Sequence, residues 1–144
     1  MMSRFDFWNR WLLVVGWVLV AFGLIFAVLS QTWLYELAFN RHIDPVFWPE
    51  KPIPPSAEQF QAWIYGVLGA TVAGWGVFVV FLARHPLRRR ERWAWNCLFI
   101  GITAWFAVDT AISAFYGVFF NVLFNCGLAV SVYLPLVATR KEFR

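Results

Sequence analysis

Asp109 is the only acidic or basic residue inside the four long apolar stretches of this chain. An ionisable group within a membrane-spanning helix is costly and usually has a function. Other polar or aromatic residues share a helical face with Asp109 or lie on one face of the next stretch, and they complete a predicted ligand-binding site: Trp105, Ser113, Tyr116, Asn121 and Asn125. The spacing predicts two polar faces turned toward each other.

The depth of these residues supports the grouping. At a rise of about 1.5 Å per residue from Trp93, where the third stretch begins, Asp109 lies about 24 Å into a hydrocarbon layer of about 30 Å. Counted from Val118 on the returning stretch, Asn121 and Asn125 lie about 4–5 Å and about 10 Å below the same surface. The two amides therefore bracket the carboxyl group in depth, and Arg41 in the outer loop between the first two stretches is the only nearby cation that would reach it.

Two interpretations of this polar region remain open. Polar side chains between membrane helices often contribute only a modest stabilising hydrogen bond. Alternatively, a few polar groups among apolar walls are what a pocket needs to orient a ligand. The first interpretation makes Asp109 structural, and the second makes it functional.

The composition predicts the elements that position the site. Of the 144 residues, 61% are hydrophobic, 21% aromatic and 14% charged, against about 45–50% apolar residues in soluble domains. Each apolar stretch approaches the ~20 residues that a helix needs to cross a bilayer. We therefore expect an all-α integral membrane protein, a four-transmembrane-helix bundle in a single domain over residues 1–144. Its helices are expected over about 11–35, 57–84, 92–116 and 118–139.

The basic residues predict one orientation. Ten of the twelve flank the first stretch, fill the turn between the second and third, or close the chain. By the positive-inside rule, both termini should be cytoplasmic. The arginines lie where orientation requires them, which argues against nucleic acid as a partner and leaves membrane lipids. The sequence has no Asn-x-Ser/Thr acceptor and its loops are short, which fits a bacterial inner (cytoplasmic) membrane.

The segment 31–59 is the only long connection, and it holds five of the seven prolines. Proline interrupts helices, so this outer loop cannot be one continuous helix. Its Phe47 and Trp48 predict that it lies along the membrane surface as a cap over the bundle. Residues 33–40 would extend the first helix, and Ser56 with Gln59 forms a capping-box pattern that would start the second.

A stripe of small residues predicts a packing face on the second helix: Ala62, Gly66, Ala70 and Gly74. Small residues at spacings of four let another helix approach closely. The sequence favours a helix of the same chain on this face, with a second copy or another membrane protein as the alternative.

The sequence gives little support for a metal or cofactor site. His42 and Asp44 could supply two ligands, but a zinc site usually needs three or four from the protein. The sequence contains no Gly-rich phosphate loop, HExxH or GxSxG motif. No cofactor and no metal site are predicted.

These observations predict a non-enzymatic membrane protein that binds a lipid, a hydrophobic small molecule or a membrane partner at the polar site near the outer face. One alternative is an enzyme acting on an amphiphile, with Asp109 or His42 as general acid or base. Another is a transporter or channel subunit in which Asp109 takes up a proton or cation. A pH-dependent turnover would indicate the enzyme, and flux in liposomes would indicate the transporter.

Overall fold

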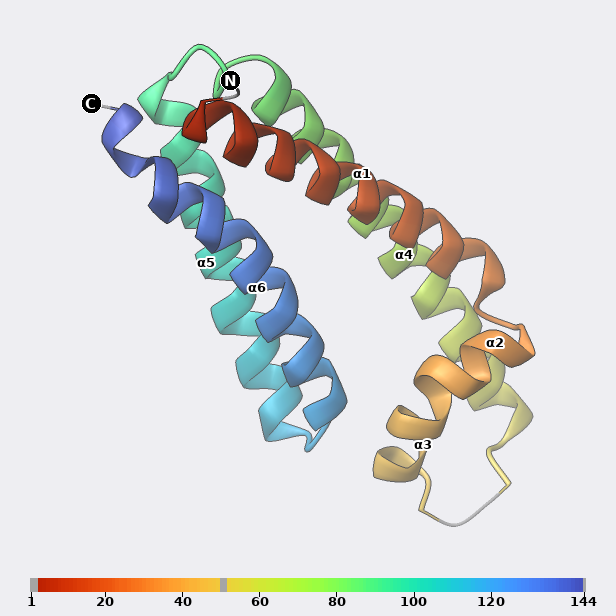
Figure 1. Cartoon of the computed structure of the whole chain (residues 1–144). Coiled ribbons are helices and arrows are strands. Elements are labelled where there is room, and N and C mark those ends of the chain that lie inside the picture. Colours follow the sequence, from red (N-terminus) through yellow and green to blue (C-terminus); the bar gives the residue numbers. More distant parts are fainter. Residues whose placement is uncertain (1–2, 50–51, 144) are drawn as a thin grey trace.

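The computed structural model describes residues 3–49 and 52–143, and it is helical almost throughout, with no β-strand among those residues. Four helices are long and apolar enough to cross a membrane, as the sequence predicts. The elements of Figure 1 are α1 Arg4–Leu29, α2 Trp33–Tyr35, η1 Glu36–Asn40, α3 Arg41–Phe47, α4 Pro55–Arg84, α5 Arg92–Phe115, α6 Phe119–Thr139 and η2 Arg140–Glu142.

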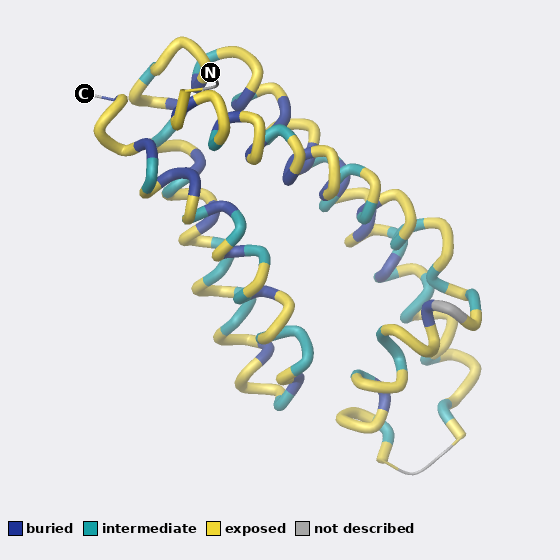
Figure 2. Tube along the Cα trace, in the orientation of Figure 1, coloured by how far each residue is buried: buried dark blue, intermediate teal, exposed yellow. Residues whose placement is uncertain are grey.

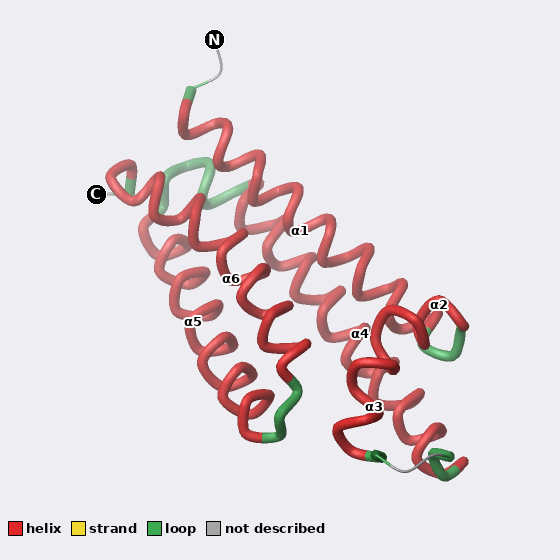
Figure 3. The backbone as a smooth tube through the Cα atoms, turned by 60° about the horizontal axis from the view of Figure 1, so that its bottom comes forward, coloured by secondary structure: helices red, strands yellow, loops and turns green. Residues whose placement is uncertain are grey.

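The long helices form two antiparallel hairpins, α1 with α4 and α5 with α6, which meet along α1 and α6. Both termini and the α4–α5 turn lie at one end of the molecule, called here the terminal end (Figure 1). Residues 30–49 and 52–54, which belong to the connection between α1 and α4 and are called here the connecting segment, lie at the opposite, distal end, close to the α5–α6 turn (Figure 3). The basic regions of the sequence therefore gather at one end.

Figure 2 shows buried positions on the inward sides of the helices and exposed positions around the outside. The exposed positions include large apolar side chains on all four long helices, such as Val28 at 76% and Phe115 at 83% exposure. A surface this apolar suits hydrocarbon rather than water.

The first helix differs from its predicted bounds at both ends. It begins at Arg4 because Ser3 caps it: the Asp6 backbone N–H donates to Ser3 Oγ at 3.1 Å, and Ser3 Oγ donates to the Asp6 carboxylate at 2.7 Å. It ends at Leu29, whose carbonyl accepts from both the backbone N–H and the hydroxyl of Thr32. The predicted helix 11–35 is thus wrong beyond Leu29, because a local turn satisfies the last carbonyl.

The segment after that turn is helical again rather than an extension of α1. It runs through α2, the π-helical η1 and α3, which tolerates Pro45 inside it. At the other end of the connection, α4 begins at Pro55, so the predicted capping box at Ser56 is not its start. Proline suits the first helical position because its missing N–H would have had no partner there.

The close packing of α1 on α4 uses a different face of α4 from the predicted stripe. A Cβ atom added to Gly69 would lie 2.5 Å from the Ala27 backbone nitrogen, and one added to Gly76 would lie 2.5 Å from that of Val20. A Cβ added to Gly74 would meet nothing within 4 Å, and Ala70 is exposed. Within the stripe, Gly66 approaches α1 less closely, since an added Cβ would lie 3.9 Å from the Ala27 carbonyl oxygen. The stripe therefore does not make the closest contact within the chain, and the partner alternative stays a prediction.

Two indole groups satisfy carbonyls of α6 that its backbone leaves free. Pro135 has no N–H for the carbonyl of Ser131, four residues earlier, and Trp11 Nε1 donates to that carbonyl at 2.8 Å. Near the end of α6, Trp95 Nε1 donates to the Leu136 carbonyl at 2.8 Å. In hydrocarbon each unsatisfied carbonyl would be costly, so these bonds tie α1 and α5 to α6.

At the terminal end, Arg90 joins the α4–α5 turn to both ends of the chain. Its guanidinium lies 4.9 Å from the Phe5 ring centroid and 3.3 Å from a Glu142 carboxylate oxygen. Arg90 has a positive φ of 61°, which is uncommon for a residue other than glycine. Arg90 thus has an unfavourable backbone conformation, while its side chain contacts Phe5 and Glu142.

Candidate functional site

Asp109 lies between α5 and α6 and accepts hydrogen bonds from both helices. Its Oδ1 accepts from Ser113 Oγ at 3.1 Å, from Asn121 Nδ2 at 2.8 Å and from Asn125 Nδ2 at 2.8 Å. Asn125 is only 1% exposed and also donates to Thr110 Oγ1 at 3.3 Å. These five residues are called here the Asp109 cluster.

Helical spacing explains why the cluster forms. Asp109 and Ser113 are one turn apart on α5, Asn121 and Asn125 one turn apart on α6, and the tight turn at Gly117 turns the two faces toward each other. Gly117 has a φ of 75°, a conformation that glycine adopts without a steric penalty. The structure therefore brings together four of the six predicted site residues.

The other two predicted residues point elsewhere. Tyr116 is 56% exposed, and its ring lies 6.2 Å from that of Phe47 in α3. Trp105 makes an edge contact with Trp75 of α4, with ring centroids 5.9 Å apart. Neither has a hydrogen bond to the cluster within the described part of the chain.

All three hydrogen bonds that described residues make to the Asp109 carboxylate end on Oδ1. Oδ2 is left as an acceptor on a partly exposed side chain. Exposed apolar residues lie on the same helix one turn away or less, such as Val108 and Ile112. The cluster thus holds the α5–α6 hairpin together and also presents one carboxylate oxygen to a donor from outside it.

An apolar groove of about 610 Å³ runs between α1 and α6, on the face of α6 next to the one that carries Asn121 and Asn125. Its α6 side follows a helical stripe that includes Phe120, Phe124, Gly127 and Ser131. The ring of Phe22 on α1 packs 5.3 Å from that of Phe124. The groove was not predicted, although the spacing of its α6 residues would have indicated one face.

The connecting segment covers the distal end beside this groove. The His42 ring stacks on Phe120 with centroids 4.8 Å apart, and Phe39 packs on the edge of the same ring at 5.7 Å. The Gly117 turn is also close, because a Cβ there would lie 3.9 Å from Val46. Contacts with both α5–α6 and α4 make this segment a bridge between the hairpins.

His42 and Asp44 face opposite sides of that bridge. His42 stacks on α6, whereas Asp44 is 4% exposed and its Oδ1 accepts from Gln61 Nε2 of α4 at 2.7 Å. Among the described residues, no three His, Cys, Asp or Glu side chains converge to hold a metal ion. The pair suggested by the sequence therefore does not form one site.

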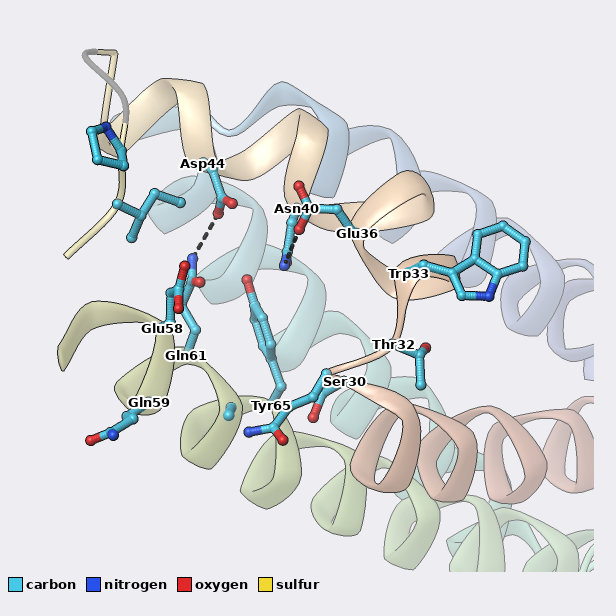
Figure 4. Close-up of a pocket in the computed structure, with 14 residues that line it drawn as sticks. Ser30, Thr32, Trp33, Glu36, Asn40, Asp44, Glu58, Gln59, Gln61 and Tyr65 are labelled. Carbon is cyan, nitrogen blue, oxygen red and sulfur yellow. Dashed lines mark hydrogen bonds between the residues drawn. The ribbon is translucent and has the colours of Figure 1, made fainter. Parts of the chain in front are cut away.

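A second, polar cavity of about 560 Å³ lies where α1 ends, between the connecting segment and the start of α4 (Figure 4). Glu36, Asn40 and Asp44 reach it from one face of the connecting segment, and Glu58 and Tyr65 reach it from α4. The spacing of 36, 40 and 44 is helical. Sequence reasoning missed this face because it extended the first helix only to residue 40 and left Asp44 in a loop.

No protein-family model, no curated protein and no solved structure matches this chain.

Proposed function

We propose that this chain is an integral membrane protein of the bacterial inner membrane, with both termini cytoplasmic. Four helices of sufficient length and apolarity support the insertion, and the gathering of the basic regions at the terminal end supports the orientation. Single cysteines introduced at Ser3 and Ser56 should then be labelled by a membrane-impermeant thiol reagent from opposite sides, in a variant lacking Cys97 and Cys126. Labelling of both from the same side would contradict the topology.

Within the membrane, we propose that the protein binds a lipid or a hydrophobic small molecule without transforming it. The observation that carries this proposal is the apolar groove between α1 and α6, because it lies between two hairpins and has a volume typical of ligand pockets. Its walls are almost wholly apolar, and Phe120 and Phe124 form its distal part.

Apolar walls alone do not select a ligand in a bilayer, because lipid tails are as apolar as the groove. The choice of ligand then depends on the shape of the groove and on a polar group that fixes the orientation of the ligand. Asp109 Oδ2 is our candidate for that group, since Oδ1 is occupied by the hairpin. Asn121 and Asn125 place the cluster at the level of Phe120 and Phe124, on the adjacent face of α6. The ligand is expected to carry a hydroxyl, amide or amine donor beside an apolar body.

Native mass spectrometry of the protein released from its own membranes tests the groove. Gly127 lines it, and a Cβ there would meet nothing within 4 Å, so Gly127→Leu should fill the groove without a backbone clash. Gly101 on α5 is equally open and lies outside the groove, which makes Gly101→Leu the matched control. We expect a bound hydrophobic molecule in the wild type and in Gly101→Leu and its loss in Gly127→Leu.

Asp109→Asn tests the polar anchor separately. Asparagine retains a carbonyl oxygen for the hairpin bonds but replaces the second carboxylate oxygen with an amide nitrogen that cannot accept. Loss of the ligand in this variant, with normal folding, would support the role of Oδ2. Retention of the same molecule by Gly127→Leu, or a wild type that carries only bulk lipids in their membrane proportions, would refute the proposal for the groove.

A further inference from the structure

The terminal end of the molecule concentrates positive charge far from the apolar groove. Ten of the twelve basic residues belong to the start of the chain, the region between α4 and α5 and the end of the chain, and nine of the ten are arginines. Figure 1 shows that the start of α1, the α4–α5 turn and η2 come together. The same three stretches of sequence contain only three acidic residues, Asp6, Glu91 and Glu142. The terminal end therefore has a large excess of positive charge.

Side-chain contacts join the three segments into one surface. The rings of Phe5 in α1 and Phe143 after η2 have centroids 6.0 Å apart. The guanidinium of Arg90 in the turn lies 4.9 Å from the Phe5 centroid. Leu87 of the same turn is only 2% exposed and belongs to the buried cluster that contains both rings. The basic residues around this core are therefore held in fixed positions relative to one another.

The α4–α5 turn presents two arginines from an ordered backbone. The backbone N–H of Arg89 donates to the His85 carbonyl at 3.2 Å. The backbone N–H of Arg90 donates to the Leu87 carbonyl at 2.9 Å. Arg88 and Arg89 follow the buried Leu87 directly, and both are exposed. A ligand bound by these two side chains would have little backbone entropy to remove, because the turn is already ordered.

The acidic residues of this end leave most of its arginines uncompensated. Glu142 pairs with Arg90 at 3.3 Å, and this is the one ion pair among the residues that the structure describes. Asp6 lies near both Arg10 and Arg88, which places the arginines of α1 beside those of the turn. One carboxylate cannot neutralise two guanidinium groups. The surface around Arg10 and Arg88 therefore attracts an anion from outside the chain.

The type of basic residue distinguishes a binding surface from an orientation signal. The positive-inside rule counts lysine and arginine alike, so lysines would orient the chain equally well. The guanidinium presents a planar fork of donors that matches a phosphate group in a bidentate way, whereas lysine acts as a point charge. Trp93 and Trp11 expose their indole rings near this end, as residues at a membrane interface do. The arginines thus suit phosphate groups at the level of lipid headgroups.

We propose that Arg88 and Arg89, together with Arg10, bind the phosphate of an anionic phospholipid headgroup in the cytoplasmic leaflet. The inference rests on the proposed membrane insertion and orientation, but it is independent of a ligand in the groove. A soluble nucleic acid shares the phosphate chemistry. Lipid is the occupant that the position favours, because an inserted bundle holds this surface permanently against the headgroups.

Native mass spectrometry of the full chain in dodecylmaltoside micelles, titrated with phosphatidylglycerol or with phosphatidylcholine, tests the proposal. We expect the wild type to bind phosphatidylglycerol at least tenfold more tightly than phosphatidylcholine. Arg88→Gln/Arg89→Gln should weaken the binding of phosphatidylglycerol at least tenfold, because each arginine near an anionic surface contributes about fivefold in affinity. Arg41→Gln removes an exposed cation from the distal end and should bind as the wild type does.

Arg88→Lys/Arg89→Lys separates phosphate recognition from charge, because this pair keeps both positive charges and removes both guanidinium forks. It should bind phosphatidylglycerol about threefold more weakly than the wild type or worse. Equal affinity in the lysine pair, unchanged affinity in the glutamine pair, or a wild type that does not prefer phosphatidylglycerol would each overturn the proposal. Displacement of the lipid by inorganic phosphate or by a single-stranded oligonucleotide, beyond that by chloride at equal ionic strength, would indicate a soluble partner and would also overturn it.

Two controls separate this proposal from the preceding ones. Gly127→Leu, which fills the groove, should keep the preference for phosphatidylglycerol, and the glutamine pair should keep the molecule bound in the groove. Thiol labelling at Ser3 and Ser56 in the lysine pair checks that the orientation is unchanged. Failure of the groove, of the topology or of the headgroup site is therefore seen in a different measurement.

Discussion

The hydrogen bond from Trp11 to the Ser131 carbonyl exists because Pro135 cannot donate to that carbonyl, and this dependence can be measured. Trp11→Phe removes the indole N–H and leaves an aromatic ring. In membrane proteins such a hydrogen bond contributes about 0.6 kcal/mol on average and up to about 1.7 kcal/mol to stability. Removing the donor costs more than this average when the carbonyl is left without any partner. We expect Trp11→Phe to lower the free energy of unfolding by about 1–2 kcal/mol, including lost ring contacts.

Pro135→Ala restores the missing backbone N–H, so the Ser131 carbonyl would keep one donor when Trp11 is replaced. In the Pro135→Ala background, Trp11→Phe should therefore cost about 0.5 kcal/mol or less, which is a coupling free energy of about 1 kcal/mol. Reversible unfolding in mixed micelles of dodecylmaltoside and sodium dodecyl sulfate, followed by circular dichroism at 222 nm, gives the four free energies of the cycle.

Trp95→Phe provides the control for this cycle, because Trp95 donates to the Leu136 carbonyl, whose helical partner would be residue 140 rather than 135. The loss in free energy of unfolding caused by Trp95→Phe should be the same with and without Pro135→Ala, within the deviation of about 0.3–0.5 kcal/mol from additivity that independent sites show. An equal cost of Trp11→Phe with and without Pro135→Ala would refute the reasoning, since the indole would then act only through packing.

Three further predictions concern the two hairpins. Gly69→Leu should lower the unfolding temperature sharply, because the new side chain would meet the backbone of α1. Gly74→Leu should leave the unfolding temperature nearly unchanged, because a Cβ there meets nothing within 4 Å. Equal effects of the two substitutions in a thermal melt would contradict the packing of α1 on α4. Asn125→Leu removes a 1% exposed donor to Asp109 and should cost about 1–3 kcal/mol in the same micelle titration; no loss would show that the cluster does not hold the hairpin. Gly117→Val should cost about 1 kcal/mol or more, because a β-branched residue is strained at a φ of 75°, and unchanged stability would argue against that turn.

Much of the site could be anticipated because it depends on two helices joined by a short turn. When the turn is fixed at Gly117, the spacing of Asp109 and Ser113 on α5 and of the two asparagines on α6 determines which faces meet. Trp105 shares the face of Asp109 but lies outside the cluster, because it is further from the turn and packs against Trp75 of α4.

The sequence by itself determined the number of long helices and the gathering of its basic regions at one end, because apolar length and charge are properties of each segment alone. Only the tertiary structure decided which small residues of α4 approach α1 most closely, since Gly66 and Gly69 are equally small but only Gly69 lies where an added Cβ would clash with the α1 backbone. The α1–α6 groove and the distal cavity belong to the same class. Each is a space between separate elements, and its shape depends on how those elements pack, which residue spacing within one helix does not encode.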